Sequence, residues 1–227
     1  MGFSNIQYHG TTVTGCTPKT IGGAILSVTA EANGRPVSYV LIGSQLPPDG
    51  EWVAVTDHLL KQTMNYVMIE NGLAYYTVYT SMVKHQRLVF REAADAVRKK
   101  SAPMAAAAGA GVGVSTSTAA AVSGKQTVWN LDSSREFRLD DQRSISPGGS
   151  LILPKLFRRC TDYLRDVAKG FDGNLTDWMK AKDTGSRSEN DKVVVNGIEL
   201  KFTDLITQNN RTISLQADIL DMIFVEK

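Results

Sequence analysis

Residues 36–48 read PVSYVLIGSQLPP, and this stretch decides the fold expected for the N-terminal half of the chain. Its first seven residues are mostly apolar, β-branched or aromatic, which is typical of a strand. A run of the same kind, AILSVTA, occupies residues 24–30, and Asn33-Gly34 lies between the two runs. Because Asn-Gly is a strong turn signal between two such runs, the pattern predicts an antiparallel hairpin.

A helix, a strand and a second helix are predicted after this hairpin. Thr56 is a suitable N-cap, because its hydroxyl can accept an unpaired N–H of the first helical turn, and apolar residues recur at helical spacing over residues 60–68. Gly72 is typical of the residue that ends a helix. The aromatic and β-branched run Leu73–Thr80 predicts a strand, and residues 83–100 predict a helix with one apolar side.

The composition changes abruptly after Lys100. Residues 101–123 are almost entirely alanine, glycine, serine, threonine and valine, and they carry no charge. Such a segment has too little bulky apolar surface to offset its ordering entropy, so we expect a flexible insertion over about residues 101–125. Gly124-Lys125 does not complete a phosphate-binding loop, since Gln126 stands where a serine or threonine is required.

The second half, residues 131–227, predicts a small α+β domain of no recognised family. Pro154 opens a predicted helix that ends at Gly170, and a second short helix is predicted around Trp178. Asn196-Gly197 predicts a hairpin, and residues 213–225 predict a pair of half-buried strands. The predicted apolar stripe of the first helix consists of Leu156, Cys160, Tyr163, Leu164 and Val167.

Five pieces of the first half occur in an informative order. They are IGGAIL (21–26), PVSYVLIGSQLPP (36–48), MNYVMIENGLAY (64–75), REAADAVR (91–98) and Trp129. In this order they resemble the staphylococcal nuclease (thermonuclease) family. Its corresponding segments include an Asp-Gly-Asp-Thr strand start, a strand reading roughly Arg-Leu-x-Gly-Ile-Asp-Thr-Pro-Glu, and a terminal Gly-x-Trp. The resemblance implies an α+β fold with a five-stranded OB-fold β-barrel and packed helices over residues 1–130.

The resemblance also implies that the catalytic residues have been lost. The family's reaction needs calcium held by carboxylates, a glutamate that activates water and two arginines on the phosphate. Matched residue by residue, the first calcium aspartate falls at Ala24 and the first arginine at Val40. The second aspartate, the threonine and the glutamate fall at Gln45, Leu46 and Pro48, and the second arginine has no counterpart. We therefore expect an inactive nuclease fold with no metal or cofactor.

Three nearby acids leave one alternative open. Asp49, Glu51 and Asp57 lie just after the matched strand. If they replaced the lost carboxylates, the protein would be a divergent calcium-dependent phosphodiesterase. The competing interpretation places them in a turn, on the solvated surface and at the start of a helix.

Two sets of aromatic and basic residues are candidate contacts for nucleic acid or another ligand. The first is Tyr75 and Tyr79 with Lys84 and Arg87 nearby, because OB-folds stack bases on aromatic side chains beside basic groups. Core packing of the tyrosines is the competing interpretation. The second set is Arg158 and Arg165, which with Lys169 are spaced at seven and four along one helix face. That face is either a phosphate-binding patch or an ordinary solvated surface.

Composition sets weak limits on the partner. The net charge is +2, the apolar fraction is 42%, and Cys16 and Cys160 show no metal-binding or disulfide spacing. The first residues lack a secretory signal pattern, and no apolar run approaches the length of a membrane span. We expect a soluble cytoplasmic protein that binds nucleic acid or a protein partner and uses no membrane or small-molecule cofactor.

Overall fold

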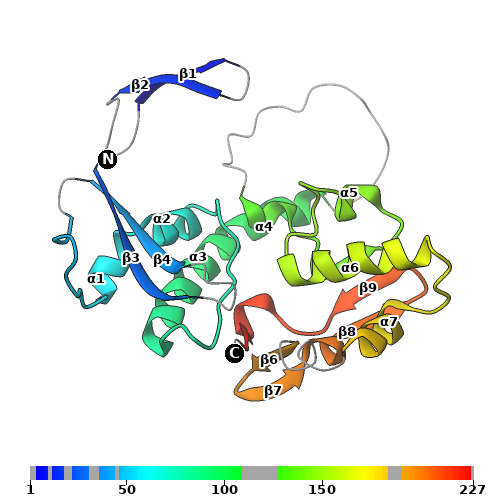
Figure 1. Ribbon diagram of the computed structural model, residues 1–227. Coiled ribbons are helices and arrows are strands. Elements are labelled where there is room, and N and C mark those ends of the chain that lie inside the picture. The colour runs from blue at the N-terminus through cyan, green and yellow to red at the C-terminus, as the bar shows by residue number, and fades with distance from the viewer. Residues whose placement is uncertain are drawn as a thin grey trace. The chain divides into compact units, whose positions relative to one another are not determined.

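The computed structural model describes residues 4–9, 12–17, 22–30, 36–43, 46–108, 127–183 and 191–225 (Figure 1). The chain divides into two compact units, residues 1–68 and 69–227. Helices and short antiparallel strands occur in both, so the predicted α+β class is confirmed. The predicted domain boundary near residue 130 falls inside the second unit and stays a prediction. No helix in the described ranges is long and apolar enough to cross a membrane.

The first unit contains two antiparallel hairpins and short helices. Its elements are β1 (Ser4–His9), β2 (Thr12–Thr17), β3 (Gly23–Ala30), β4 (Pro36–Ile42), α1 (Asp57–Lys61) and the start of α2 (Met64–Glu70). β1 pairs with β2 and β3 with β4. The hairpin predicted around Asn33-Gly34 is therefore confirmed as β3–β4, although the turn itself lies outside the described residues.

The helix predicted after Thr56 forms as two short helices. The Thr56 hydroxyl accepts the Leu59 N–H at 3.3 Å, which confirms the predicted cap. Buried Thr63 then separates α1 from α2, because its hydroxyl donates to the Leu60 carbonyl and accepts the Tyr66 N–H. These bonds compete with the regular helical pattern, as threonine side chains commonly do.

The second unit contains longer helices and two three-stranded sheets. Its helices are α3 (Lys84–Ala108), α4 (Val128–Leu131), α5 (Gln142–Ile145), α6 (Pro154–Val167) and α7 (Leu175–Lys182), with 3₁₀ turns η1 (Phe202–Leu205) and η2 (Ile219–Asp221). Its strands are β5 (Glu136–Arg138), β6 (Lys192–Val195), β7 (Ile198–Lys201), β8 (Ile206–Asn209), β9 (Thr212–Leu215) and β10 (Met222–Phe224). The sheet orders are β10-β6-β7 and β5-β9-β8.

The core of the second unit lies where α6 and α7 pack together with the strands. Tyr163 of α6 meets Trp178 of α7 edge to face, with ring centroids 6.2 Å apart. The predicted helices are thus confirmed, but the apolar stripe of α6 is buried only in part, because Val167 is 38% exposed. The fully buried apolar side chains of this core include Leu156, Cys160, Leu175, Met179, Val193, Phe202 and Ile213.

One strand prediction in this unit is wrong, and another is confirmed in part. The run Leu73–Thr80 forms no strand, and its one β-bridge joins Tyr79 to Phe224. Tyr76 and Val78 are buried. The aromatic and β-branched side chains that predicted a strand therefore pack in the core, although no ladder forms. The C-terminal run 213–225 does form strands, but β9 and β10 belong to different sheets and do not pair with each other.

The first eight residues of the predicted flexible insertion are helical. Helix α3 continues through residues 101–108 to Ala108, and Ser101 bonds to the Val97 carbonyl and to Thr127 through its hydroxyl. Residues 109–126 lie outside the described part of the chain. The expected OB-fold barrel is not shown, since the described strands form four separate open sheets.

Gly72, which ends α2, is a position where we expect an added side chain to destabilise the fold. Its φ is +66°, and an added Cβ would lie 2.6 Å from Thr127 Cβ and 3.0 Å from Val97 Cγ1. We expect Gly72→Ala to lower the free energy of unfolding by about 2–4 kcal/mol, from backbone strain plus steric overlap. Urea denaturation measures this loss.

Gly170→Ala is the matched control, because Gly170 also has a positive φ of +98° but no atom lies within 4 Å of its added Cβ. It should lose about 1 kcal/mol, from strain alone. Equal losses in the two variants would mean that Thr127 and Val97 move aside at no cost.

Candidate functional site

The hairpin β3–β4 places the two family-matched positions that it contains on opposite faces. Ala24 pairs with Leu41, and Ile25 pairs with Val40. Because side chains alternate along a strand, Ala24 lies on the face of buried Leu41, whereas Val40 lies on the other face and is 37% exposed. One compact site cannot use both side chains.

The exposed side of this hairpin is apolar. We call it the outer face and define it by Ile25, Val40 and Ile42, which are 69%, 37% and 36% exposed. The opposite face is buried, with Tyr39 and Leu41 only 4% and 3% exposed, and burial raises the pKa of Tyr39 to about 12. The hairpin therefore has one face in the core and one apolar face in solvent.

Among the described residues, the remaining matched positions and the nearby acids are not grouped as metal ligands. Leu46 is half-buried and Pro48 exposed, while Gln45 lies outside the described residues. Asp49, Glu51 and Asp57 are exposed, and Asp57 is the first residue of α1. Within the described ranges, no three histidine, cysteine, aspartate or glutamate side chains are grouped so that they could hold a metal ion.

The two tyrosines of the predicted aromatic and basic set have different contacts in the structure. The Tyr75 hydroxyl donates to Asp132 Oδ2 at 2.7 Å, its ring lies 5.1 Å from that of Trp129, and burial strongly raises its pKa. Tyr79 is 43% exposed and contacts the Phe224 ring at 6.0 Å. This arrangement favours the packing interpretation for Tyr75.

Arg87 and Lys84 have different surroundings. The Arg87 guanidinium donates to the carbonyl oxygens of Tyr79 and Thr80 at 3.4 and 3.3 Å, so it supports the backbone of the preceding segment. Lys84 is exposed at the first turn of α3. Tyr79 and Arg87 are brought together, but as parts of one turn around the start of α3.

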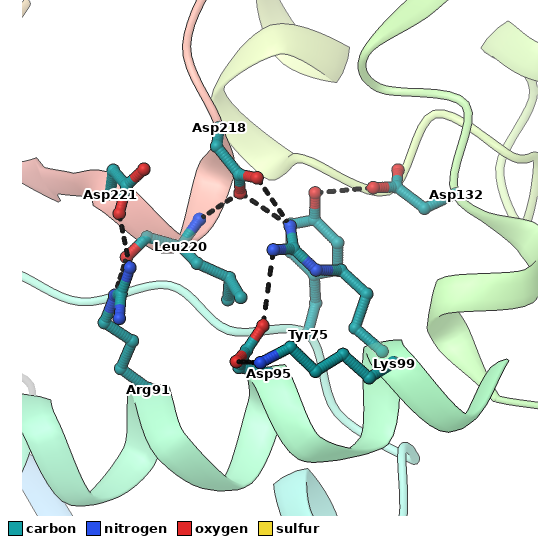
Figure 2. Close-up of polar contacts among 9 residues, drawn as sticks. Tyr75, Arg91, Asp95, Lys99, Asp132, Asp218, Leu220 and Asp221 are labelled. Atoms are coloured by element: carbon teal, nitrogen blue, oxygen red, sulfur yellow. Dashed lines mark hydrogen bonds and ion pairs between the residues drawn. The ribbon is translucent and has the colours of Figure 1, made fainter. Parts of the chain in front are cut away.

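A network of charged residues joins α3 to the C-terminal segment (Figure 2). Arg91 donates to the Leu220 carbonyl at 2.9 Å and to Asp221 at 2.6 Å. Arg98 binds both oxygens of Asp218 through one nitrogen, at 2.6 and 2.8 Å. The sequence pattern gives no signal for these aspartates, because they lie in an apolar run that predicts strands.

An open groove lies beside this network. Its volume is about 560 Å³, and Asp132, Ser133, Arg135, Glu136, Ser214, Leu215 and Gln216 line it. Carboxylates and one guanidinium share the lining, so the groove presents both signs of charge. A phosphate-binding groove would instead be dominated by cations.

The predicted basic stripe on α6 is exposed but partly neutralised. Arg158 and Arg165 of α6 are exposed, and so is Lys169, which lies two residues beyond the end of the helix. Asp162 lies on the same face, four residues after Arg158, and its carboxylate is 2.9 Å from Arg165 Nη1. This arrangement favours an ordinary solvated surface over a phosphate-binding patch.

The other two basic residues of α6, Lys155 and Arg159, lie in a buried ionic cluster. Lys155 Nζ lies 2.9 Å from Asp191 Oδ1, and Arg159 Nη2 lies 3.1 Å from both Asp191 and Asp183. Thr203 donates to Asp183 at 3.0 Å. The Asp191 side chain is 1% exposed and the Asp183 side chain 6%.

Burial controls the protonation of this cluster. Burial, and then the adjacent negative charge of Asp191, raise the pKa of Asp183. Burial likewise lowers the pKa of Lys155, although Asp191 opposes this shift. Asp191 Oδ1 lies at ion-pair distance from both cations. Two cations thus compensate two carboxylates, as in a structural ion cluster.

Comparison of the chain with protein families, characterised proteins and solved structures finds no match. The geometry of the hairpin and of the charged clusters therefore carries the functional argument. Of these features, the outer face of β3–β4 is the one formed by exposed apolar side chains.

Proposed function

We propose that this chain is a catalytically inactive relative of the staphylococcal nucleases that acts as a binding module for a protein partner. The observation that carries the proposal is the apolar outer face of β3–β4. It includes Val40, at the position where the family resemblance would place a phosphate-binding arginine. An exposed apolar surface of this kind favours contact with a protein.

Loss of catalysis follows from the chemistry that hydrolysis requires. Calcium needs oxygen ligands, and the developing negative charge needs nearby cations. Ala24 and Val40 supply neither, and they lie on opposite faces of the hairpin. The acids of the alternative interpretation, Asp49, Glu51 and Asp57, are exposed and do not belong to a metal-binding group within the described residues.

A protein partner is favoured over nucleic acid by the charges on the second unit. Asp162 interrupts the basic stripe of α6, and the groove near Arg135 has both signs of charge. An OB-type barrel that includes β3 and β4 remains part of the proposal.

Cleavage assays test the proposal. With labelled single- and double-stranded DNA and RNA, we expect no cleavage above background in calcium, magnesium or manganese, and no change on adding EDTA. The Asp49→Ala, Glu51→Ala, Asp57→Ala triple variant is the control. Cleavage that EDTA stops and that this variant lacks would establish the phosphodiesterase instead.

A single-stranded DNA column tests the partner class. We expect the protein to pass through at about 0.15 M salt, because Asp162 interrupts the basic stripe of α6 and the groove near Arg135 has both signs of charge. Retention that weakens as salt rises, and that is lost when Arg158 and Lys169 are changed to alanine, would assign nucleic acid as the partner.

A further inference from the structure

The two edges of the β3–β4 hairpin differ in how their backbone groups are satisfied. The Gly43 N–H donates to the Gly22 carbonyl at 2.9 Å, which sets the phase of the ladder. In an antiparallel pair, hydrogen-bonded and non-hydrogen-bonded positions alternate. Ala24 and Leu26 therefore bond to β4, whereas the N–H and C=O groups of Gly23, Ile25 and Ser27 point away from it.

The outer edge of β4 is covered by the chain that follows it. Asn65 Oδ1 accepts the Val40 N–H at 2.9 Å, and its amide nitrogen donates to the Ser38 carbonyl at 3.4 Å. A β-bridge joins Leu41 to Thr63. These contacts also confirm the phase, because Ser38 and Val40 are the positions that face away from β3.

Within the described residues, no side-chain hydrogen bond or β-bridge of this kind covers the edge of β3. β3 belongs to a two-stranded sheet, and no bridge outside the named strands involves it. Natural edge strands are usually protected by charged residues, proline or a bulge. Residues 23–27 contain neither charge nor proline, and the bulge between Ser27 and Thr29 lies beyond them. Gly23–Ser27 is thus a flat, uncharged edge.

We infer that this edge binds the same edge of a second copy of the chain. The inference rests on the proposed function, since it gives the hairpin a partner. The outward-facing residues of this edge are Gly23, Ile25 and Ser27. Because they are centred on Ile25, the edge can pair with an antiparallel copy of itself. Ile25 pairs with Ile25 of the second copy, and Gly23 pairs with Ser27. A two-fold axis at Ile25 satisfies the groups on both edges at once, which a closed dimer requires.

The pairing also extends the outer face. The two hairpins become one continuous sheet in the order β4-β3-β3-β4. The two Ile25 side chains, each 69% exposed in the single chain, become direct cross-strand neighbours. Because the paired edge is short, we expect a weak dimer that forms over the micromolar range.

Sedimentation equilibrium of the full chain over that range tests the inference, with two variants on the same face. Ile25→Pro removes an N–H that points outward and is not used by the β3–β4 ladder, so it should raise the dimer dissociation constant at least about tenfold. Val40→Lys is the control, because Val40 pairs with Ile25 but lies away from the β3 edge. It should change the constant less than about threefold.

The reverse order of effects, with Val40→Lys dissociating the dimer and Ile25→Pro not, would mean that copies associate through the outer face and would overturn the inference. Circular dichroism of both variants checks that each remains folded. A wild-type chain that stays monomeric over this range would also overturn the inference. This holds whether hydrogen exchange at the Ile25 amide is fast or is slowed because another strand of the same chain covers it. A monomer that cleaves no nucleic acid would leave the proposed function standing without this interface.

Discussion

Replacing Asp191 with alanine should lower the free energy of unfolding by about 3–5 kcal/mol, because it removes one member of a buried ion cluster. The Asp191 side chain is 1% exposed and lies at ion-pair distance from Lys155 and Arg159. Without it, Lys155 stays largely buried beside the rings of Phe202 and Phe224, 5.3 Å from each, and loses the carboxylate that lies 2.9 Å from its Nζ. Urea denaturation near pH 7 measures the loss.

Two variants make this prediction specific. Arg165→Ala removes an exposed ion pair on the same helix and should cost less than about 0.5 kcal/mol. Asp183→Asn should cost less than about 1 kcal/mol, since the raised pKa of Asp183 shows that the fold disfavours its charged form. An Asp191→Ala loss as small as that of Arg165→Ala would show that the cluster is solvated.

The sign of the Asp183 effect can be checked against pH. A carboxyl whose pKa is raised by folding stabilises the fold most below its ordinary value of 3.8, and this contribution is lost as the pH rises through the raised value. The free energy of unfolding that Asp183→Asn loses relative to the wild type should therefore be smaller at pH 7 than at pH 4. The opposite order would mean that the charged carboxylate stabilises the fold through Arg159.

Replacing Asp218 with alanine should lower the free energy of unfolding by about 2–4 kcal/mol. Asp218 accepts two bonds from Arg98 at 2.6 and 2.8 Å, and it caps η2 by accepting the Leu220 N–H at 2.9 Å (Figure 2). Charge-assisted hydrogen bonds contribute about 1.5–3 kcal/mol each to stability at most, and a cap contributes about 1 kcal/mol. Thermal or urea unfolding measures the loss.

The pH dependence of this variant follows from the pKa of Asp218. Burial acts to raise that pKa, but the bonds from Arg98 and Leu220 outweigh it and hold the pKa below 3.8. A lowered pKa stabilises the fold above 3.8, and this contribution is lost as the pH falls through the folded value. The wild type should lose this part of its stability in acid, and Asp218→Ala should not.

Asp95→Ala is the matched control for Asp218. Asp95 pairs with Arg98 at 3.5 Å and with exposed Lys99 at 2.7 Å on the surface of α3. Such pairs along one helix contribute about 0.5 kcal/mol or less. If the two variants lost equal stability, the connection from α3 to the C-terminal segment would not depend on Asp218.

The sequence by itself determined the elements whose causes lie within a few residues. The hairpin β6–β7 forms at Asn196-Gly197, where both residues have the positive φ values, +52° and +82°, that a type I′ turn requires. Thr56 caps α1, and Pro154 begins α6. In each case the deciding group and its partner are near neighbours in the chain, so residue type and spacing were sufficient.

Only the tertiary structure decided the features whose partners are distant. Arg91 binds the Leu220 carbonyl 129 residues away, and Lys155 and Arg159 enter the core because Asp183 and Asp191 lie there. Leu73–Thr80 has the composition of a strand but forms no ladder with the described strands. A charged helix face or a strand-like run has the same local sequence pattern whether or not a distant part of the chain packs against it. Burial and pairing across the chain therefore determine which residues become core, surface or edge.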